Sequence, residues 1–175
     1  MSTKRVLDLG SGLNPDYRAT DMVDYQKENA KVLIHEEKNH FKFQIRPLGM
    51  SESRIKELQN YRDTHINAKW GVNYNARLPY PDNTFDIIVS HASLAAFGEL
   101  KAYKEAYRVL KRDGIIEVAA SELPRDWIDR ITKHLKDARF AEIKISKKRQ
   151  DKRLFLHNLE DKRFKDDVIY AKKMG

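Results

Sequence analysis

The sequence predicts an α/β fold, a doubly wound and mostly parallel sheet with helices on both faces. Short apolar runs with the length of buried strands alternate with segments of helical periodicity along the chain. Turns rich in Gly, Pro, Asp and Asn separate these segments, and no repeat or low-complexity linker interrupts them. Because 175 residues suffice for one such core, we predict a single domain over residues 1–175.

Seven segments have the composition of strands. The clearest are the short apolar runs at residues 6–9, 86–90 and 115–119. Weaker candidates lie at residues 18–23, 72–74, 143–145 and 168–170. The last two of these could close the sheet.

Helical periodicity marks residues 51–66, 100–110 and 124–135. Ser51 or Ser53 is suited to cap the first helix, and Pro124 opens the third. The second helix ends at residues 111–114, where cations suit the C-terminal dipole and Gly114 can adopt the left-handed cap.

Composition restricts the location and the partners. Cysteine is absent, which excludes disulfides, thiolate metal sites and cysteine nucleophiles, and no apolar run has the roughly 20 residues of a membrane span. The first strand begins near the N-terminus, so we expect no targeting segment and a cytoplasmic location. Of the net charge of +8, +7 lies after residue 132, where 14 Lys and Arg face 7 Asp and Glu. This basic region could attract nucleic acid or be a solvated surface that resists aggregation.

Polar residues follow several predicted strands. In open parallel sheets, ligands bind beyond the carboxyl ends of the strands, near the point where the strand order reverses. We therefore expect three segments to converge there: the turn Gly10-Ser11-Gly12, the acids near Asp24, and Ser90-His91.

The glycine turn after the first strand lets the backbone approach a ligand closely. Asp8, at the end of that strand, can hold a cationic amino group or, through water, a ribose. The dinucleotide fingerprint would need a third glycine where Pro15 stands, so the pattern disfavours NAD. A plain turn is the alternative interpretation.

An acid at the end of the second strand suits the two hydroxyls of a ribose. Asp24 and Asp21 are both candidates for this role. The alternative is that either acid is merely solvated at a strand end.

Three blocks in order resemble one enzyme family. They are residues 6–12, residues 75–90 (which contain Leu-Pro-Tyr-Pro-Asp-Asn-Thr-Phe-Asp) and residues 105–114. Together they are similar to the class I S-adenosylmethionine-dependent methyltransferases, in the branch with a Leu-Pro-Phe-Pro-Asp-Asn-Ser-Phe-Asp segment. The resemblance covers most of residues 4–120 and implies a Rossmann-like, seven-stranded methyltransferase fold.

The resemblance also implies a cofactor, S-adenosyl-L-methionine, and roles for individual residues. Asp8, Gly10 and Gly12, with Ser11 between them, would line the methionine end, and Asp24 or Asp21 would hold the ribose. Asn75 stands where the family usually has an Asp that contacts the adenine amino group, and its side-chain oxygen can still accept that hydrogen bond. Ala76 would offer backbone beside the adenine, and Ser90 and His91 would face the transferred methyl group.

The chain departs from the family pattern at three places. The first crossover helix is missing or reduced to a turn around Asn14-Pro15, and Ala95-Ala96 replaces an acidic-His pair. Residues 25–71, with a helical segment, have no counterpart in the family. We predict that they are an insertion that carries acceptor specificity.

Methyl transfer to a hydroxyl also requires removal of a proton. His91 is our first candidate base because imidazole titrates near neutrality, and Glu122 is the second. The alternative is that His91 caps a strand end.

Sequence features limit the chemical class of the methyl acceptor. Methylation of a pyrimidine ring carbon through a covalent adduct requires a cysteine, and the chain has none. The chain also lacks the Pro-Pro-aromatic motif of the families that methylate exocyclic amino groups of DNA bases. The six histidines show no metal-ligand spacing. We therefore predict transfer to an oxygen or nitrogen of a small-molecule or nucleotide-like acceptor. A catalytically silent cofactor-binding module and an RNA- or DNA-directed enzyme are the alternatives.

Overall fold

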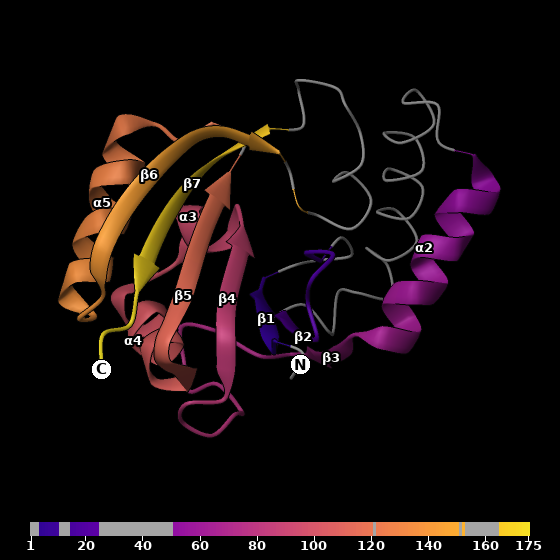
Figure 1. Ribbon diagram of the computed structural model, residues 1–175, viewed down its shortest axis with the longest axis horizontal. Coiled ribbons are helices and arrows are strands. Elements are labelled where there is room, and N and C mark those ends of the chain that lie inside the picture. Colours follow the sequence, from indigo (N-terminus) through magenta and orange to yellow (C-terminus); the bar gives the residue numbers. More distant parts are fainter. Residues whose placement is uncertain (1–3, 11–14, 25–50, 121, 151, 153–164) are drawn as a thin grey trace.

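The computed structural model describes residues 4–10, 15–24, 51–120, 122–150, 152 and 165–175. The strands of these residues form one sheet: β1 (Val6–Leu9), β2 (Asp21–Asp24), β3 (Asn67–Trp70), β4 (Phe85–His91), β5 (Leu110–Ala120), β6 (Ala141–Gln150) and β7 (Lys165–Lys172). Their order is β3-β2-β1-β4-β5-β7-β6, and β7 is the one strand of this sheet that runs opposite to the others (Figure 1). The predicted mostly parallel, doubly wound, seven-stranded sheet is confirmed.

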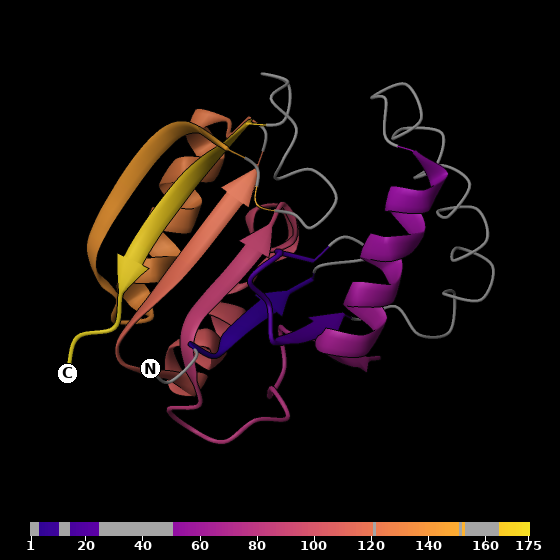
Figure 2. The same cartoon turned by 45° about the vertical axis from the view of Figure 1, so that its right-hand side comes forward.

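Three helices cover one face of the sheet. α3 (Ser93–Phe97), α4 (Leu100–Val109) and α5 (Arg125–Asp137) share a core with the strands and lie behind them in Figure 2. Side chains alternate along β5, so Ile116 and Val118 are buried in this core while Ile115 points to the opposite face and is 38% exposed. None of the helices in the described ranges has the length and apolar composition that a membrane crossing requires.

The region predicted as an insertion is partly integral to the sheet. α2 (Glu52–His65) is capped by Ser51, whose hydroxyl accepts a hydrogen bond from Arg54 N, and leads into β3, which pairs parallel with β2. β3 lies just before the strand predicted at 72–74. Its sequence, Asn-Ala-Lys-Trp, contains no apolar run, and it is a strand because its backbone pairs with β2. Residues 52–70 therefore complete a β-α-β unit with β2. Residues 25–50 of the predicted insertion lie outside the described residues.

Residues 111–114, predicted as the turn that ends the second helix, lie within β5 instead. Asp113, and not Gly114, has the left-handed conformation, with φ of 62°. A Cβ on Gly114 would lie 2.6 Å from Leu110 Cγ and 2.9 Å from the Lys111 carbonyl oxygen. Glycine is therefore needed at 114 for close approach of the backbone, not for its dihedral angles.

The connection between β1 and β2 is short. Residues 15–20 contain no helix, in agreement with the predicted shortened crossover. The Tyr17 amide donates to the Lys152 carbonyl oxygen at 2.8 Å, so this connection lies beside the residue that follows β6. It therefore brings its polar side chains toward the face of β4, β5 and β7 that α3, α4 and α5 leave uncovered.

Candidate active site

Gly10 follows β1 at the carboxyl edge of the sheet. Its φ is +71°, and its amide donates to the Val23 carbonyl oxygen at 2.9 Å. A Cβ here would lie 2.2 Å from Ser93 Oγ, and that hydroxyl is 2.7 Å from the Tyr74 hydroxyl. Glycine is thus required both for its dihedral angle and for the close packing of the segments that follow β1, β3 and β4.

Asp24 ends β2 beside this turn. It pairs with Trp70 of β3, and its carbonyl oxygen accepts a hydrogen bond from Val72 N at 2.9 Å. Asp21 lies at the opposite, amino end of β2, where Arg5 donates two hydrogen bonds of 2.9 and 3.0 Å to its carboxylate. Asp21 therefore does not lie at the carboxyl edge, and Asp24 is the remaining candidate for binding the ribose hydroxyls.

Asp8 is a buried acid with an unused acceptor. One carboxylate oxygen accepts a hydrogen bond from Asp16 N at 2.7 Å, and the other has no partner among the described residues. Burial raises the pKa of Asp8 to about 7, against the attraction of nearby His91. Asp8 therefore sits at the midpoint of its titration near neutral pH.

The hydroxyl of Ser90 is already hydrogen-bonded within the protein. It is fully buried, donates to the Leu9 carbonyl oxygen at 2.8 Å and accepts from Leu94 N at 3.0 Å. The prediction that its side chain faces the methyl group is wrong, because the hydroxyl already joins β1 to the start of α3.

His91 lies between two carboxylates. Its Nε2 is 3.2 Å from Asp16 Oδ2 and its Nδ1 is 3.1 Å from Asp166 Oδ2, and its side chain is 8% exposed. Burial disfavours the charged ring, but the hydrogen bonds to both carboxylates outweigh it and raise the pKa of His91 to about 10. In this protonated form, both ring nitrogens donate to the carboxylates beside them. His91 is therefore an imidazolium at neutral pH, which corrects its predicted role as the base.

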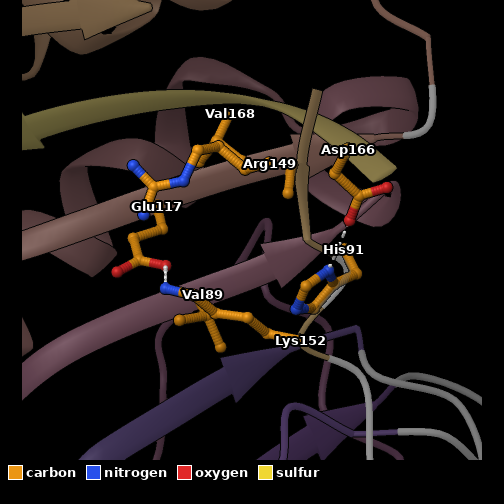
Figure 3. Close-up of a pocket in the computed structure, with 8 residues that line it drawn as sticks. Val89, His91, Glu117, Arg149, Lys152, Asp166 and Val168 are labelled. Atoms are coloured by element: carbon orange, nitrogen blue, oxygen red, sulfur yellow. Dashed lines mark hydrogen bonds and ion pairs between the residues drawn. The ribbon is translucent and has the colours of Figure 1, made fainter. Parts of the chain in front are cut away.

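Arg18 extends this cluster across the sheet. Its guanidinium donates to both oxygens of Asp16 at 2.8 Å and to both oxygens of Glu117 at 2.8 and 3.1 Å. Lys152 Nζ is 3.2 Å from Glu117 as well (Figure 3). Despite burial, these partners hold the pKa values of Asp16 and Glu117 below their usual range and raise that of Arg18. We call Asp8, Asp16, Arg18, His91, Glu117, Lys152 and Asp166 the buried ionic cluster.

The profile of one protein family, described as a methyltransferase domain, matches residues 7–118. The chain belongs to the methyltransferase domain family. No curated protein gives a significant match.

Solved structures of low identity share the methyltransferase fold. One is an S-adenosylmethionine-dependent methyltransferase of Thermotoga maritima, described as a possible histamine N-methyltransferase, with 15% identity, a TM-score of 0.58 and coverage of 99% of this chain and 83% of that one. Another is phosphoethanolamine N-methyltransferase 2 of Haemonchus contortus in complex with S-adenosyl-L-methionine, with 14% identity, a TM-score of 0.58 and coverage of 100% and 50%. The cyclase SpnF also matches, with 16% identity, a TM-score of 0.55 and coverage of 99% and 75%. At these identities the likeness shows the fold alone.

The remaining predicted site residues of this methyltransferase domain differ in their surroundings. Asn75 Oδ1 accepts from Glu99 N at 2.8 Å and its Nδ2 donates to the Phe97 carbonyl oxygen at 3.1 Å, so its side chain ties the loop after β3 to the α3–α4 connection. Ala76 and Glu122 are exposed, and Glu122 lies just beyond β5. Ser11 and Gly12 lie outside the described residues.

Sequence reasoning missed Asp16, Arg18 and Asp166. The signal available was the pair Asp166-Asp167, which stands at the start of an apolar strand where a buried acid needs a cation. In the described part of the chain, no three His, Asp or Glu side chains are arranged to hold a metal ion.

Proposed function

We propose that this methyltransferase domain binds S-adenosyl-L-methionine at the carboxyl edge and transfers its methyl group to an oxygen or nitrogen of a small-molecule or nucleotide-like acceptor. The observation that carries the proposal is the meeting of Gly10, Asp24 and Asp8 at the ends of neighbouring strands β1 and β2. Membership of the methyltransferase domain family supports the reaction class. The bound cofactor in the Haemonchus contortus structure supports the choice of cofactor.

The chemistry of the site fits this cofactor. Asp8 has a buried carboxylate oxygen without a donor among the described residues, which suits a cationic amino group either directly or through one water. Asp24 supplies a carboxylate where the two hydroxyls of a ribose would need acceptors. The cofactor, when bound, supplies a methyl group that is already activated as a sulfonium.

The chain must then orient the acceptor, exclude water and, for a hydroxyl, accept a proton. His91 has no free lone pair for that proton. Glu122, at the end of β5, is the base that we propose for a hydroxyl acceptor, whereas a neutral amine needs none. We also propose that residues 25–50 contribute to acceptor specificity.

Asp24→Ala is expected to weaken binding of S-adenosyl-L-methionine at least about tenfold, because hydrogen bonds to a charged group each contribute roughly 1.5–3 kcal/mol. Isothermal titration calorimetry measures this loss. Asp21→Ala is the matched control, which removes an acid of the same strand at its other end and should leave the affinity unchanged. Equal losses in the two variants would remove Asp24 from the site.

Affinity for S-adenosylhomocysteine, which carries the same amino group, is expected to rise roughly eightfold between pH 6 and 7.5. Asp8, with a pKa of about 7, is mostly protonated at pH 6 and mostly ionised at pH 7.5, and only the ionised form pairs with the ammonium group. Calorimetry at constant ionic strength measures the change. Asp8→Asn should bind more weakly and with no such dependence; a dependence that persists in this variant would contradict the role of Asp8.

The reaction itself is tested by incubation with S-adenosyl-L-methionine and a panel of acceptors, with S-adenosylhomocysteine as the measured product. Oligonucleotides belong in the panel because β6 exposes Lys144, Lys147 and Arg149. Tight cofactor binding without transfer to any acceptor would favour a silent binding module. Absence of cofactor binding would overturn the proposal.

A further inference from the structure

A small cavity opens on the face of β4, β5 and β7 that lies opposite α3, α4 and α5. Three aliphatic side chains of these strands and five ionic side chains line it (Figure 3). The cavity adjoins the short β1–β2 connection, which reaches it through Arg18 and Asp16.

The carboxylates of the cavity are already neutralised. Asp166 pairs with His91, and Glu117 pairs with both Arg18 and Lys152. Neither acid therefore has an unmatched negative charge to offer a cationic ligand.

Arg149 differs from the other ionic side chains that line the cavity. Its guanidinium lies 6.0 Å from the centroid of the Tyr170 ring and has no carboxylate partner among the described residues. It is exposed at the end of the basic strand β6, so it can turn toward a ligand without breaking an ion pair to any described residue. Arginine presents a fork of donors that matches the oxygens of phosphate and carboxylate groups.

We infer that this cavity is a binding site for a small oxyanion, a phosphate or carboxylate, with Arg149 as its principal ligand and Lys152 beside it. The site lies next to the carboxyl edge, because His91 both lines the cavity and ends β4. From Val89 to His91 the cavity follows β4 for about 7 Å. An acceptor held at Arg149 by its anionic end would thus point its other end toward the edge. The inference that the bound anion is part of the methyl acceptor rests on the proposed function. The inference that the cavity binds an anion does not.

The direct test titrates the full chain, without cofactor, with inorganic phosphate and with acetate, followed by protein NMR at an ionic strength of about 0.15 M. Arg149→Gln is expected to lower the affinity for the preferred anion at least tenfold, and Arg149→Lys, which keeps the charge, to lower it less. Lys144→Gln is the matched control, an exposed cation of the same strand outside the cavity, and should bind as the unmodified protein does. The two anions show whether the site prefers phosphate or carboxylate.

Unchanged binding in Arg149→Gln, or an equal loss in Lys144→Gln, would overturn the inference, as would the absence of binding of either anion. Cofactor affinity measured on the same variants separates the two proposals, since it should be unaffected by position 149. Loss of anion binding with intact cofactor binding, or the reverse, then identifies which proposal fails. With an active acceptor pair that differs only in the anionic group, Arg149→Gln should raise KM for the anionic member alone and leave kcat unchanged. Equal effects on both members would overturn the assignment to the acceptor.

Discussion

Replacing Arg18 with methionine is expected to lower the free energy of unfolding by about 3–5 kcal/mol. The variant keeps the aliphatic stem but removes the guanidinium that joins Asp16 to Glu117. Their side chains are 0% and 13% exposed, so the carboxylates lose a partner where water reaches them poorly. Urea denaturation followed by tryptophan fluorescence measures the change.

Arg125→Met is the matched control for this prediction. Arg125 also contacts a carboxylate, that of Asp129 one helical turn away, but its side chain is 88% exposed. Such exposed pairs contribute less than about 1 kcal/mol. Equal losses in the two variants would mean that water, and not Arg18, compensates the charges of the cluster. In the double variant with Glu117→Gln, part of the loss should be recovered, because one unpaired charge is removed.

The sequence was sufficient to predict most of the sheet. β4, β5, α4 and α5 were predicted because each buries a face with its own periodicity, and local periodicity is visible in a single sequence. β3 was misplaced because an edge strand such as Asn67–Trp70 depends on backbone pairing, which any side chains permit. The same limit explains why the residues of β3 were placed in the predicted insertion.

The site was less predictable than the fold. Strand ends and the glycine turn located Gly10, Asp8 and Asp24, because topology alone determines where strands end. The partner of a polar side chain is a tertiary property, and Ser90 and Asn75 look like ligand-binding residues in sequence but bind the backbone in the structure. The pKa of His91 depends on carboxylates 75 residues away in both directions.

The buried ionic cluster lies on the face of β4 and β5 opposite α3, α4 and α5. The short connection of residues 15–20 brings Asp16 and Arg18 against His91 and Glu117 there. Each buried charge on this face must lie beside a counter-ion, because an unpaired buried charge destabilises the fold. The network therefore ties the β1–β2 connection to β4 and β5, and its protonation state should be visible in the stability of the whole domain.

Stability is expected to fall by about 2 kcal/mol between pH 8 and 9.5 because of His91. The pKa of His91 is about 10 in the folded chain, against a value of 6.5 for an unperturbed histidine. The folded state thus binds one more proton than the unfolded state in this interval, and the stabilisation, complete below pH 6.5, is lost as pH rises through 10. Asp8, whose pKa is raised to about 7, loses its own contribution as pH rises through 7, so it adds little slope above pH 8.

Urea denaturation at a series of pH values measures this slope, and His91→Gln should abolish it. His134→Gln is the control: burial lowers the pKa of His134, so that residue titrates below the interval and its replacement should leave the slope intact. Because His91→Gln itself weakens the cluster, NMR of the imidazole nitrogens in the unmodified protein gives a second readout, in which the ring of His91 should remain doubly protonated at pH 8. A neutral ring at that pH would show that Asp16 and Asp166 do not hold the proton, and would restore His91 as a candidate base.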